Sequence, residues 1–279
     1  MVAPILRDVR GLPDPTSRLV VSDDAQERLD GAVPSPAASF LLTLIVLPSL
    51  FWLVTLKRTT THLGPEVWFM NHVVFPIHGW VQANAAPVDP VLRGISALGS
   101  GWFVALGFAC VGLLALAKGR RDLALLLALG TLAFPIEWAL KYFTAIPAIS
   151  LPQLGDALFN LNGVGLDDVA KFPAGHALRA TVFYGLVAFS IARLSSDRRQ
   201  GTTAYLAAGM LIGLISLSRL YLFAQYPLDL LGGWMAGAAL VAILVSVHVL
   251  RADERIRGRA EAARVGSVPP PRARASSSR

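Results

Sequence analysis

Six long apolar runs alternate with shorter polar segments along the chain. Four of the runs carry at most one charged residue, and the other two each carry a single arginine near one end. Each run has about the 18 residues that a helix needs to cross the hydrocarbon layer of a membrane. We therefore predict an all-α fold, a bundle of six transmembrane helices. The runs cover residues 39–56, 95–117, 123–140, 176–192, 202–223 and 230–250.

Residues 63–83 have a mixed pattern. Apolar residues such as Trp68 and Phe75 are interrupted by polar ones such as Glu66 and His78. This mixture favours a helix that lies in the membrane interface, or a re-entrant segment. A seventh transmembrane span is the alternative, and it would place the two termini on opposite sides of the membrane.

The composition supports the membrane interpretation. Of the 279 residues, 54% are hydrophobic and only 15% are charged, whereas soluble domains carry about 25% charged residues. The formal net charge is +7, but the basic residues cluster at the ends of apolar runs and near the C-terminus. That is a pattern of membrane topology and not of nucleic-acid binding. Cys110 is the single cysteine, which excludes disulfides and cysteine-ligated metal sites within the monomer. We expect no metal, no other cofactor and no nucleic-acid partner.

Basic residues also predict the orientation. With both termini in the cytoplasm, most of the 25 lysine and arginine residues fall on the cytoplasmic side, and this total outweighs the local disagreement of Lys57 and Arg58. We predict a multi-pass protein of the plasma membrane with a membrane domain at residues 38–250. A disordered cytoplasmic tail is expected at residues 1–37, and a basic one at residues 251–279. Contact of the C-terminal arginines with anionic lipids is a secondary hypothesis.

Three polar segments fall on the outer side in this topology, and each has residues suited to phosphate. Pro173, Gly175 and His176 begin a predicted span, where backbone N–H groups favour an anion beside a titratable side chain. Arg219 lies near the outer end of another span, and Lys141 follows a third. Both are cations that suit phosphate oxygens.

Simpler structural roles exist for the same charges. Arg179 and Arg219 could extend their long side chains to the interface while their helices stay in the membrane. Lys141 could pair with Glu137, one turn earlier on the same helix. For any one of these residues alone, the structural role is the better interpretation.

The three segments together resemble the signature of the phosphatidic acid phosphatase type 2 and haloperoxidase superfamily, in its membrane lipid-phosphate phosphatase branch. That signature runs Lys-x6-Arg-Pro, then Pro-Ser-Gly-His, then Ser-Arg-x5-His-x3-Asp. The resemblance covers residues 137–250, and it implies the six-helix fold with all motifs on the outer face. The matching residues in this chain are Lys141, Pro173, Gly175, His176, Ser218, Arg219 and Asp229.

The resemblance implies a role for each matching residue. His176 would protonate the leaving oxygen, and Asp229 would orient the histidine nucleophile that precedes it in the family. The phosphate would be held by Lys141, Gly175, Ser218 and Arg219.

This chain departs from the family pattern at three positions. Ala148 stands in place of the first-motif arginine and Ala174 in place of the second-motif serine, so two phosphate contacts are absent. Gln225 stands in place of the nucleophilic histidine. A carboxamide has no basic lone pair with which to attack phosphorus, and losing a nucleophile costs a factor of about 10³ to 10⁶ in rate. We then expect Asp229 to accept a hydrogen bond from Gln225 or to pair with a nearby cation.

No other side chain is an evident replacement for the nucleophile. His248 lies toward the inner end of the last span. Three histidines on the outer side could fold over the site, but histidines at surfaces and interfaces are common and nothing fixes their geometry. Two aspartates precede the second motif, and a solvated loop is the simpler interpretation of them. The outer-side residues concerned are His62, His72, His78, Asp167 and Asp168.

The sequence thus predicts a membrane protein that recognises a lipid phosphate or diphosphate at the outer leaflet, with phosphatase chemistry impaired or lost. One alternative is an active phosphatidic acid or polyprenyl diphosphate phosphatase with an unusual mechanism that uses His176. Another is a non-catalytic structural subunit. Enzyme activity, the identity of the lipid and any protein partner stay open at this point.

Overall fold

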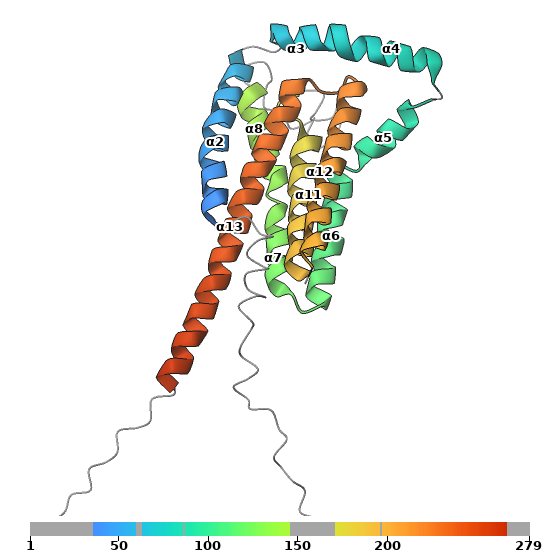
Figure 1. The fold of residues 1–279 in the computed structure, drawn as a ribbon. Helices are drawn as coiled ribbons and strands as arrows, with labels where there is room; N and C mark the ends of the chain where they lie inside the picture. Colours follow the sequence, from blue (N-terminus) through green and yellow to red (C-terminus); the bar gives the residue numbers. More distant parts are fainter. Residues whose placement is uncertain (1–35, 60–62, 86, 146–170, 196, 267–279) are drawn as a thin grey trace, which may run out of the picture.

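The computed structural model describes residues 36–59, 63–85, 87–145, 171–195 and 197–266. Every regular element in these residues is helical, so the predicted all-α fold is confirmed. Most helices stand side by side in an upright bundle, and α3 to α4 lie across one end of it (Figure 1). The helices are α2 (Pro36–Thr59), α3 (Gly64–Phe69), the π-helical turn η2 (Met70–Val74), α4 (Phe75–Asn84), α5 (Asp89–Ala97), α6 (Gly101–Ala117), α7 (Arg121–Gly130), α8 (Ala133–Ala145), α11 (Gly175–Leu194), α12 (Arg198–Tyr221) and α13 (Pro227–Gly266).

The predicted spans coincide with helices that are long and apolar enough to cross a membrane. Five such helices occur in the described residues, and a sixth span is formed if the pair α5 and α6, bent by 46°, counts as one. Each of the six apolar runs overlaps one of these spans. The spans are Leu41–Thr59, Arg121–Thr144, Gly175–Leu194, Arg198–Tyr221 and Pro227–Ala252, with Asp89–Ala97 and Gly101–Ala117 as the bent pair.

The bend between α5 and α6 is stabilised by groups from α11. A Cβ on Gly99 would lie 2.8 Å from Cγ2 of Ile215 in α12 and 3.2 Å from the carbonyl oxygen of His176 in α11, so a side chain here would crowd both helices. The carbonyls at the break accept hydrogen bonds from α11: Tyr184 donates to Leu98 at 3.1 Å and Arg179 donates to Gly99 at 3.4 Å. These bonds replace the helical ones that the bend breaks, as an apolar environment requires.

A second, milder break separates α7 from α8 within the third span. Pro135 lies in the first turn of α8 and has no N–H to offer the carbonyl of Thr131. The Thr131 carbonyl accepts instead from the backbone N–H of Phe134 at 3.1 Å. The span therefore continues across the break, from Arg121 to Thr144.

Helix α11 lies at the centre of the bundle and is buried along most of its length. Leu178, Val182 and Leu186, spaced four residues apart, are fully buried and face the core. Glycines on α13 allow that helix to approach α11 closely: a Cβ on Gly233 would lie 2.6 Å from the carbonyl oxygen of Ala174. Close packing through small residues is a common source of stability between helices in membranes.

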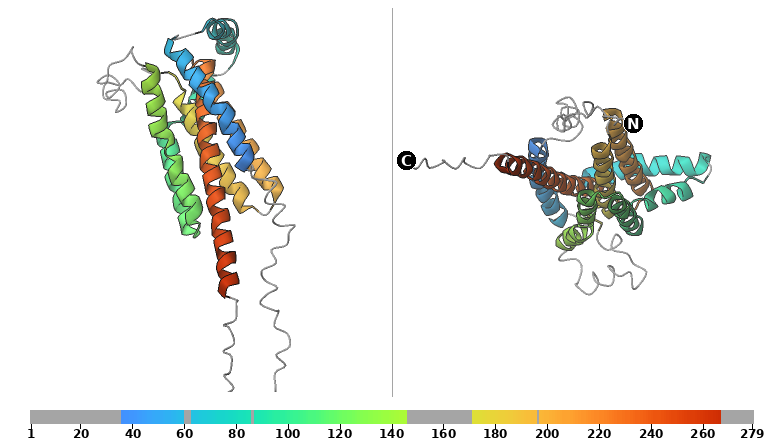
Figure 2. Two further views of the ribbon diagram at one scale, coloured as in Figure 1. Left: turned by 90° about the vertical axis from the view of Figure 1, so that its left-hand side faces the viewer. Right: turned by 90° about the horizontal axis from the view of Figure 1, so that it is seen from below.

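The segment from α3 to α4 lies across the end of the bundle instead of along it, in both side views (Figures 1 and 2). It is not among the helices that are long and apolar enough to cross a membrane. This placement agrees with the predicted interfacial helix and not with a seventh span. Within the segment, Phe75 and His78 contact Phe223 in the turn between α12 and α13, with ring centroids 4.6 and 4.7 Å apart.

The last helix is longer than the sequence pattern predicts. The expected span ends at residue 250 and a disordered tail was expected from Arg251, but α13 continues to Gly266. The expectation of disorder was therefore wrong for residues 251–266. This stretch is rich in alanine, arginine and glutamate, which are strong helix formers, and it follows a helix that is already nucleated. The predicted tail at residues 1–37 lies almost entirely outside the described residues, since α2 begins at Pro36.

Candidate functional site

The fold brings the three predicted motifs to the same end of the bundle, here called the motif end. Lys141 lies in the last turns of α8, and Gly175 and His176 form the first turn of α11. Arg219 is in the last turn of α12, and Asp229 is in the first turn of α13. The helix ends that carry these residues lie beneath α3 and α4, opposite the C-terminal end of α13 (Figure 1).

Hydrogen bonds connect the three motifs. The backbone N–H of Ala174 donates to the carbonyl of Asp229 at 2.8 Å, which joins the second motif to the third. The hydroxyl of Thr144 donates to the carbonyl of Phe172 at 2.9 Å, which joins the helix of Lys141 to the second motif. The motif residues therefore form one connected structure, although the chain between residues 146 and 170 lies outside the described residues.

Several polar side chains at this end are almost completely buried. Lys141, Ser218 and Gln225 have no exposed surface, and Asp229 is 2% exposed. The Ser218 hydroxyl donates to the carbonyl of Ile215 in its own helix at 2.7 Å. Burying polar groups is unfavourable unless they are paired, so such a cluster at a membrane interface is typical of a binding or catalytic site.

Gln225 is the residue whose polar groups are least satisfied. Neither its side-chain oxygen nor its side-chain nitrogen has a hydrogen-bond partner within the described residues. Leaving a buried polar atom unsatisfied costs about 1–3 kcal/mol. The amide can both donate and accept, so it is suited to hold a polar group of a ligand at the position that the family's nucleophile would occupy.

The carboxylate of Asp229 is paired with a cation from outside the three motifs. Its Oδ1 lies 3.1 Å from Nζ of Lys57, and its Oδ2 accepts from the backbone N–H of Tyr226 at 3.1 Å. Of the two partners expected for Asp229, the structure therefore has the cation and not Gln225. Lys57, at the end of α2, stands out in the sequence only as an exception to the charge asymmetry of the loops.

Lys57 also pairs with Glu66, which makes a buried triad of Lys57, Glu66 and Asp229. Nζ of Lys57 lies 2.9 Å from Oε2 of Glu66, and both side chains are 3% exposed. The Glu66 carboxylate further accepts from the backbone N–H groups of Leu63 and Leu228, each at 3.1 Å. The triad ties α2, α3 and α13 together. The only sequence signal for Glu66 was its position as an acid within the mixed segment at residues 63–83.

A second buried ion pair joins α8 to α11. Nη1 of Arg179 donates to Glu137, and both side chains are nearly buried. Arg179 Nη2 also lies 3.4 Å from Nδ1 of His176. Arg179 therefore points into the protein and does not extend to the interface. A Cβ on Gly175 would overlap the Glu137 carboxylate, so this acid lies against the first turn of α11, where the helix dipole favours an anion.

Two arginines line a small cavity at the motif end. Arg93 from α5 and Arg219 from α12 surround about 280 Å³ together with Ser96 and Leu222. Arginine side chains that converge from two helices are well suited to bind phosphate oxygens. Arg93 was not recognised from the sequence, because it lies outside the three motifs and only the bend after α5 brings it near Arg219.

An apolar groove of about 670 Å³ lies beside the triad, between α2, α3 and α13. Its head end includes Leu56, Pro65 and Leu228, which precede Lys57, Glu66 and Asp229 directly in sequence. The groove is lined by Pro48, Ser49, Trp52, Leu53, Leu56, Leu63, Pro65, Leu228, Leu231 and Met235. Its volume and mostly apolar walls suit a hydrocarbon chain.

The turn that carries Gln225 has an unusual backbone. Phe223 adopts φ of 56°, in the left-handed region that a bulky residue rarely occupies. Its ring packs against Phe75 and His78 of α4. The helix across the motif end therefore helps to hold this turn in shape.

The side chains considered as replacement nucleophiles have other surroundings. His78 packs on Tyr221 with ring centroids 4.7 Å apart, and His72 stacks on Trp68. His248 lies near the opposite end of the bundle, 3.9 Å from Asp122. The other residues of this group, and one motif position, lie outside the described residues: His62, Ala148, Asp167 and Asp168.

Comparisons with known proteins bear on the motif region. Residues 153–253 match the family model of the PAP2 superfamily. A curated relative, phosphatidylglycerophosphatase B of Bacillus subtilis (strain 168), is 31% identical over 88 residues. The alignment covers 31% of this chain and 41% of the relative, so the chain spans about two-fifths of the length of the relative that it matches.

A solved structure is similar over a larger part of the chain. It is the crystal structure of a transmembrane PAP2 type phosphatidylglycerolphosphate phosphatase from Bacillus subtilis, with a TM-score of 0.52 and 20% sequence identity. The match covers 75% of this chain and 96% of the solved one, and it supports the same fold. The resemblance to the PAP2 superfamily is thereby confirmed for residues 153–253, and the chain is a helical membrane protein whose fold is similar to that of a transmembrane PAP2 phosphatase.

Proposed function

We propose that this protein binds a phosphorylated lipid at the motif end, in the outer leaflet, and that it hydrolyses the phosphate slowly or not at all. The observation that carries the proposal is the buried Gln225 amide, which has no partner within the described residues. It occupies the position of the nucleophile in a site that keeps Lys141, His176 and Arg219. A carboxamide can hold a phosphate oxygen but cannot form a phospho-enzyme.

The state of Asp229 supports the same proposal. In the family this aspartate orients the attacking histidine, whereas here its carboxylate is paired with Lys57. The Lys57 ammonium also neutralises part of the charge of Glu66 and Asp229. A site arranged in this way can retain the lipid without activating a nucleophile, which suits a carrier or a sensor that must release its lipid intact.

The surroundings of the site indicate the class of ligand. The apolar groove beside Lys57 and Asp229 would take a hydrocarbon chain, and Arg93 and Arg219 at the same end of the bundle would take the phosphate. The curated relative and the solved structure described above are both named for phosphatidylglycerophosphate, which has this combination of parts. A glycerophospholipid with a terminal phosphate is therefore the first ligand to test.

Arg93 offers a replacement for the arginine that the first motif lacks. Ala148 has no charge, but Arg93 reaches the cavity of Arg219 from a different helix. Arg93 is exposed, so its contact with phosphate should contribute less than that of the partly buried Arg219.

A paired binding measurement tests the proposal. Wild type, Arg219→Ala and Arg93→Ala are each titrated with a lipid phosphate and with the matching unphosphorylated lipid alcohol. A charge-assisted contact in a partly dry site contributes about 1.5–3 kcal/mol, so Arg219→Ala should weaken phosphate binding by about 10- to 100-fold. Arg93→Ala should weaken it by less, about five-fold at most. Binding of the alcohol should barely change.

Arg58→Ala is the matched control, because Arg58 is an exposed arginine at the same end of the bundle, one residue after Lys57. It should leave both lipids unaffected. If wild type does not prefer the phosphate, or if Arg219→Ala weakens both lipids equally, the site does not recognise phosphate. The structural-subunit alternative would then be favoured.

A further inference from the structure

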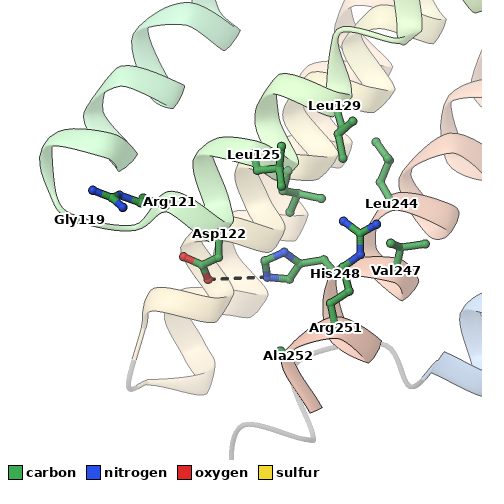
Figure 3. A pocket seen from close by; sticks show the side chains of 11 residues that line it. Gly119, Arg121, Asp122, Leu125, Leu129, Leu244, Val247, His248, Arg251 and Ala252 are labelled. Carbon is green, nitrogen blue, oxygen red and sulfur yellow. Dashed lines mark ion pairs between the residues drawn. The ribbon is translucent and has the colours of Figure 1, made fainter. Parts of the chain in front are cut away.

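A second cavity lies at the end of the bundle opposite the motifs, between α7 and the lower half of α13 (Figure 3). Its volume is about 400 Å³, larger than the cavity of Arg93 and Arg219. It is lined by Gly119, Arg121, Asp122, Leu125, Leu126, Leu129, Leu244, Val247, His248, Arg251 and Ala252. None of these residues belongs to the three motifs, and the family comparison gives no role to this end.

The cavity has an apolar wall that continues into the membrane-spanning part of both helices. Leu125 and Leu129 are one turn apart on α7, and Leu244 and Val247 are one turn apart on α13. Leu125 and Val247 are exposed in the isolated chain, where they would face lipid tails. This part of the cavity therefore suits a hydrocarbon chain that lies parallel to the helices.

The opposite part of the cavity is basic. His248 and Arg251 are one turn apart on α13, and Figure 3 shows the Arg251 guanidinium turned back toward Leu244, beside the imidazole. Arg121 adds a third basic residue from α7. Asp122 is the one acid in the lining, and it is already engaged, 3.5 Å from Arg120 and 3.9 Å from His248. The excess of charge that faces the cavity is therefore positive.

We propose that this cavity binds an anionic phospholipid of the adjacent leaflet. The phosphodiester lies beside Arg251 and His248, and one acyl chain lies along Leu125, Leu129 and Leu244. Arginine binds phosphate oxygens with two parallel hydrogen bonds, and basic pockets between transmembrane helices are suited to anionic head groups. The predicted topology places this end in the cytoplasm, where the leaflet is rich in anionic lipid. The proposal does not depend on the function of the motif end.

Both parts of the cavity determine the choice of occupant. A soluble phosphate ester would use the basic groups but would leave the leucine wall exposed. A zwitterionic phospholipid would fill the wall, but its own ammonium group competes for the phosphate. An anionic phospholipid satisfies both parts, and the lipid probe of choice is phosphatidylglycerol, with phosphatidylcholine of identical chains as its neutral counterpart.

Native mass spectrometry of the purified full-length protein tests the proposal with these two lipids. Each basic side chain near a membrane surface contributes about 1 kcal/mol, or roughly five-fold in affinity, to binding an anionic lipid. Wild type should therefore prefer phosphatidylglycerol by about ten-fold or more, and His248→Gln with Arg251→Gln should reduce the preference to about two-fold or less. Arg251→Lys, which keeps the charge, should retain most of the preference and shows that substitution at this position is tolerated.

Two further measurements test whether the preference arises at this cavity. Arg198→Gln removes an exposed arginine from the start of α12, outside the cavity, and should leave the preference unchanged. Glycerol 3-phosphate in excess should not displace the lipid. The proposal is overturned if wild type shows no preference, if the double variant keeps it, if Arg198→Gln loses it to the same extent, or if glycerol 3-phosphate competes.

Discussion

Replacing Lys57 by methionine should destabilise the protein strongly, because Lys57 is the cation between two buried carboxylates. Asp229 is 2% exposed and Glu66 is 3% exposed, and Nζ of Lys57 lies within 3.1 Å of both. Methionine has a similar length and an apolar side chain, so it fills the space and removes only the charge.

The magnitude follows from the burial of the partners. Removing one member of a buried ion pair costs about 3–5 kcal/mol, because the charge that is left has no compensation. A loss of 1 kcal/mol lowers the melting temperature by about 2–4 °C in a chain of 150–250 residues, so a decrease of roughly 6 °C or more is expected. Methionine at the neighbouring exposed position, Arg58→Met, should change the melting temperature by less than about 2 °C.

A neutral version of the triad distinguishes lost charge balance from lost packing. Lys57→Met with Glu66→Gln and Asp229→Asn leaves no buried charge, and it should recover most of the stability, since buried ion pairs can often be replaced by neutral groups. The assay measures, at each temperature, the fraction of detergent-solubilised protein that stays monodisperse after heating. The reasoning is refuted if Lys57→Met has the same melting temperature as Arg58→Met, or if the neutral triple variant is less stable than Lys57→Met alone.

Two further predictions concern chemistry and topology. Purified protein should release negligible phosphate from phosphatidic acid or polyprenyl diphosphate. Gln225→His alone should restore little of this phosphatase activity. Adding Ala148→Arg and Ala174→Ser should restore more, since residues of one site act together. Robust phosphate release by wild type that survives His176→Ala would contradict this. In a Cys110→Ala background, an impermeant thiol reagent applied to whole cells should label Lys171→Cys, which is exposed at the motif end, and spare Arg251→Cys. The opposite labelling pattern would invert the orientation.

The helices could be predicted from the sequence because each apolar run encodes its own span. Hydropathy and length are local properties, and a membrane leaves the backbone few alternatives to a helix. The end of α13 was missed for the same reason: the runs mark where the chain leaves the apolar layer, but a helix built from good helix formers continues in water beyond Arg251.

The partners within the site could not be predicted in the same way. The pairs of Lys57 with Asp229 and of Glu137 with Arg179 join residues far apart in the chain, and they depend on which helices become neighbours. Helical spacing indicates only a partner for Glu137 one turn away, such as Lys141, and it could not indicate that Arg179 of α11 also donates to that acid. The motifs identified which residues converge, and tertiary packing decided which of them are bonded to each other.

The buried triad has a consequence for how far the protein can be divided into parts. The region matched by the family model is residues 153–253, yet Asp229 within it is charge-paired with Lys57, which lies almost a hundred residues before that region begins. A fragment cut at the borders of the matched region would expose an aspartate without its counter-ion and a helix end without its covering helix. The unit that folds, and that could be exchanged between related proteins, therefore begins no later than α2.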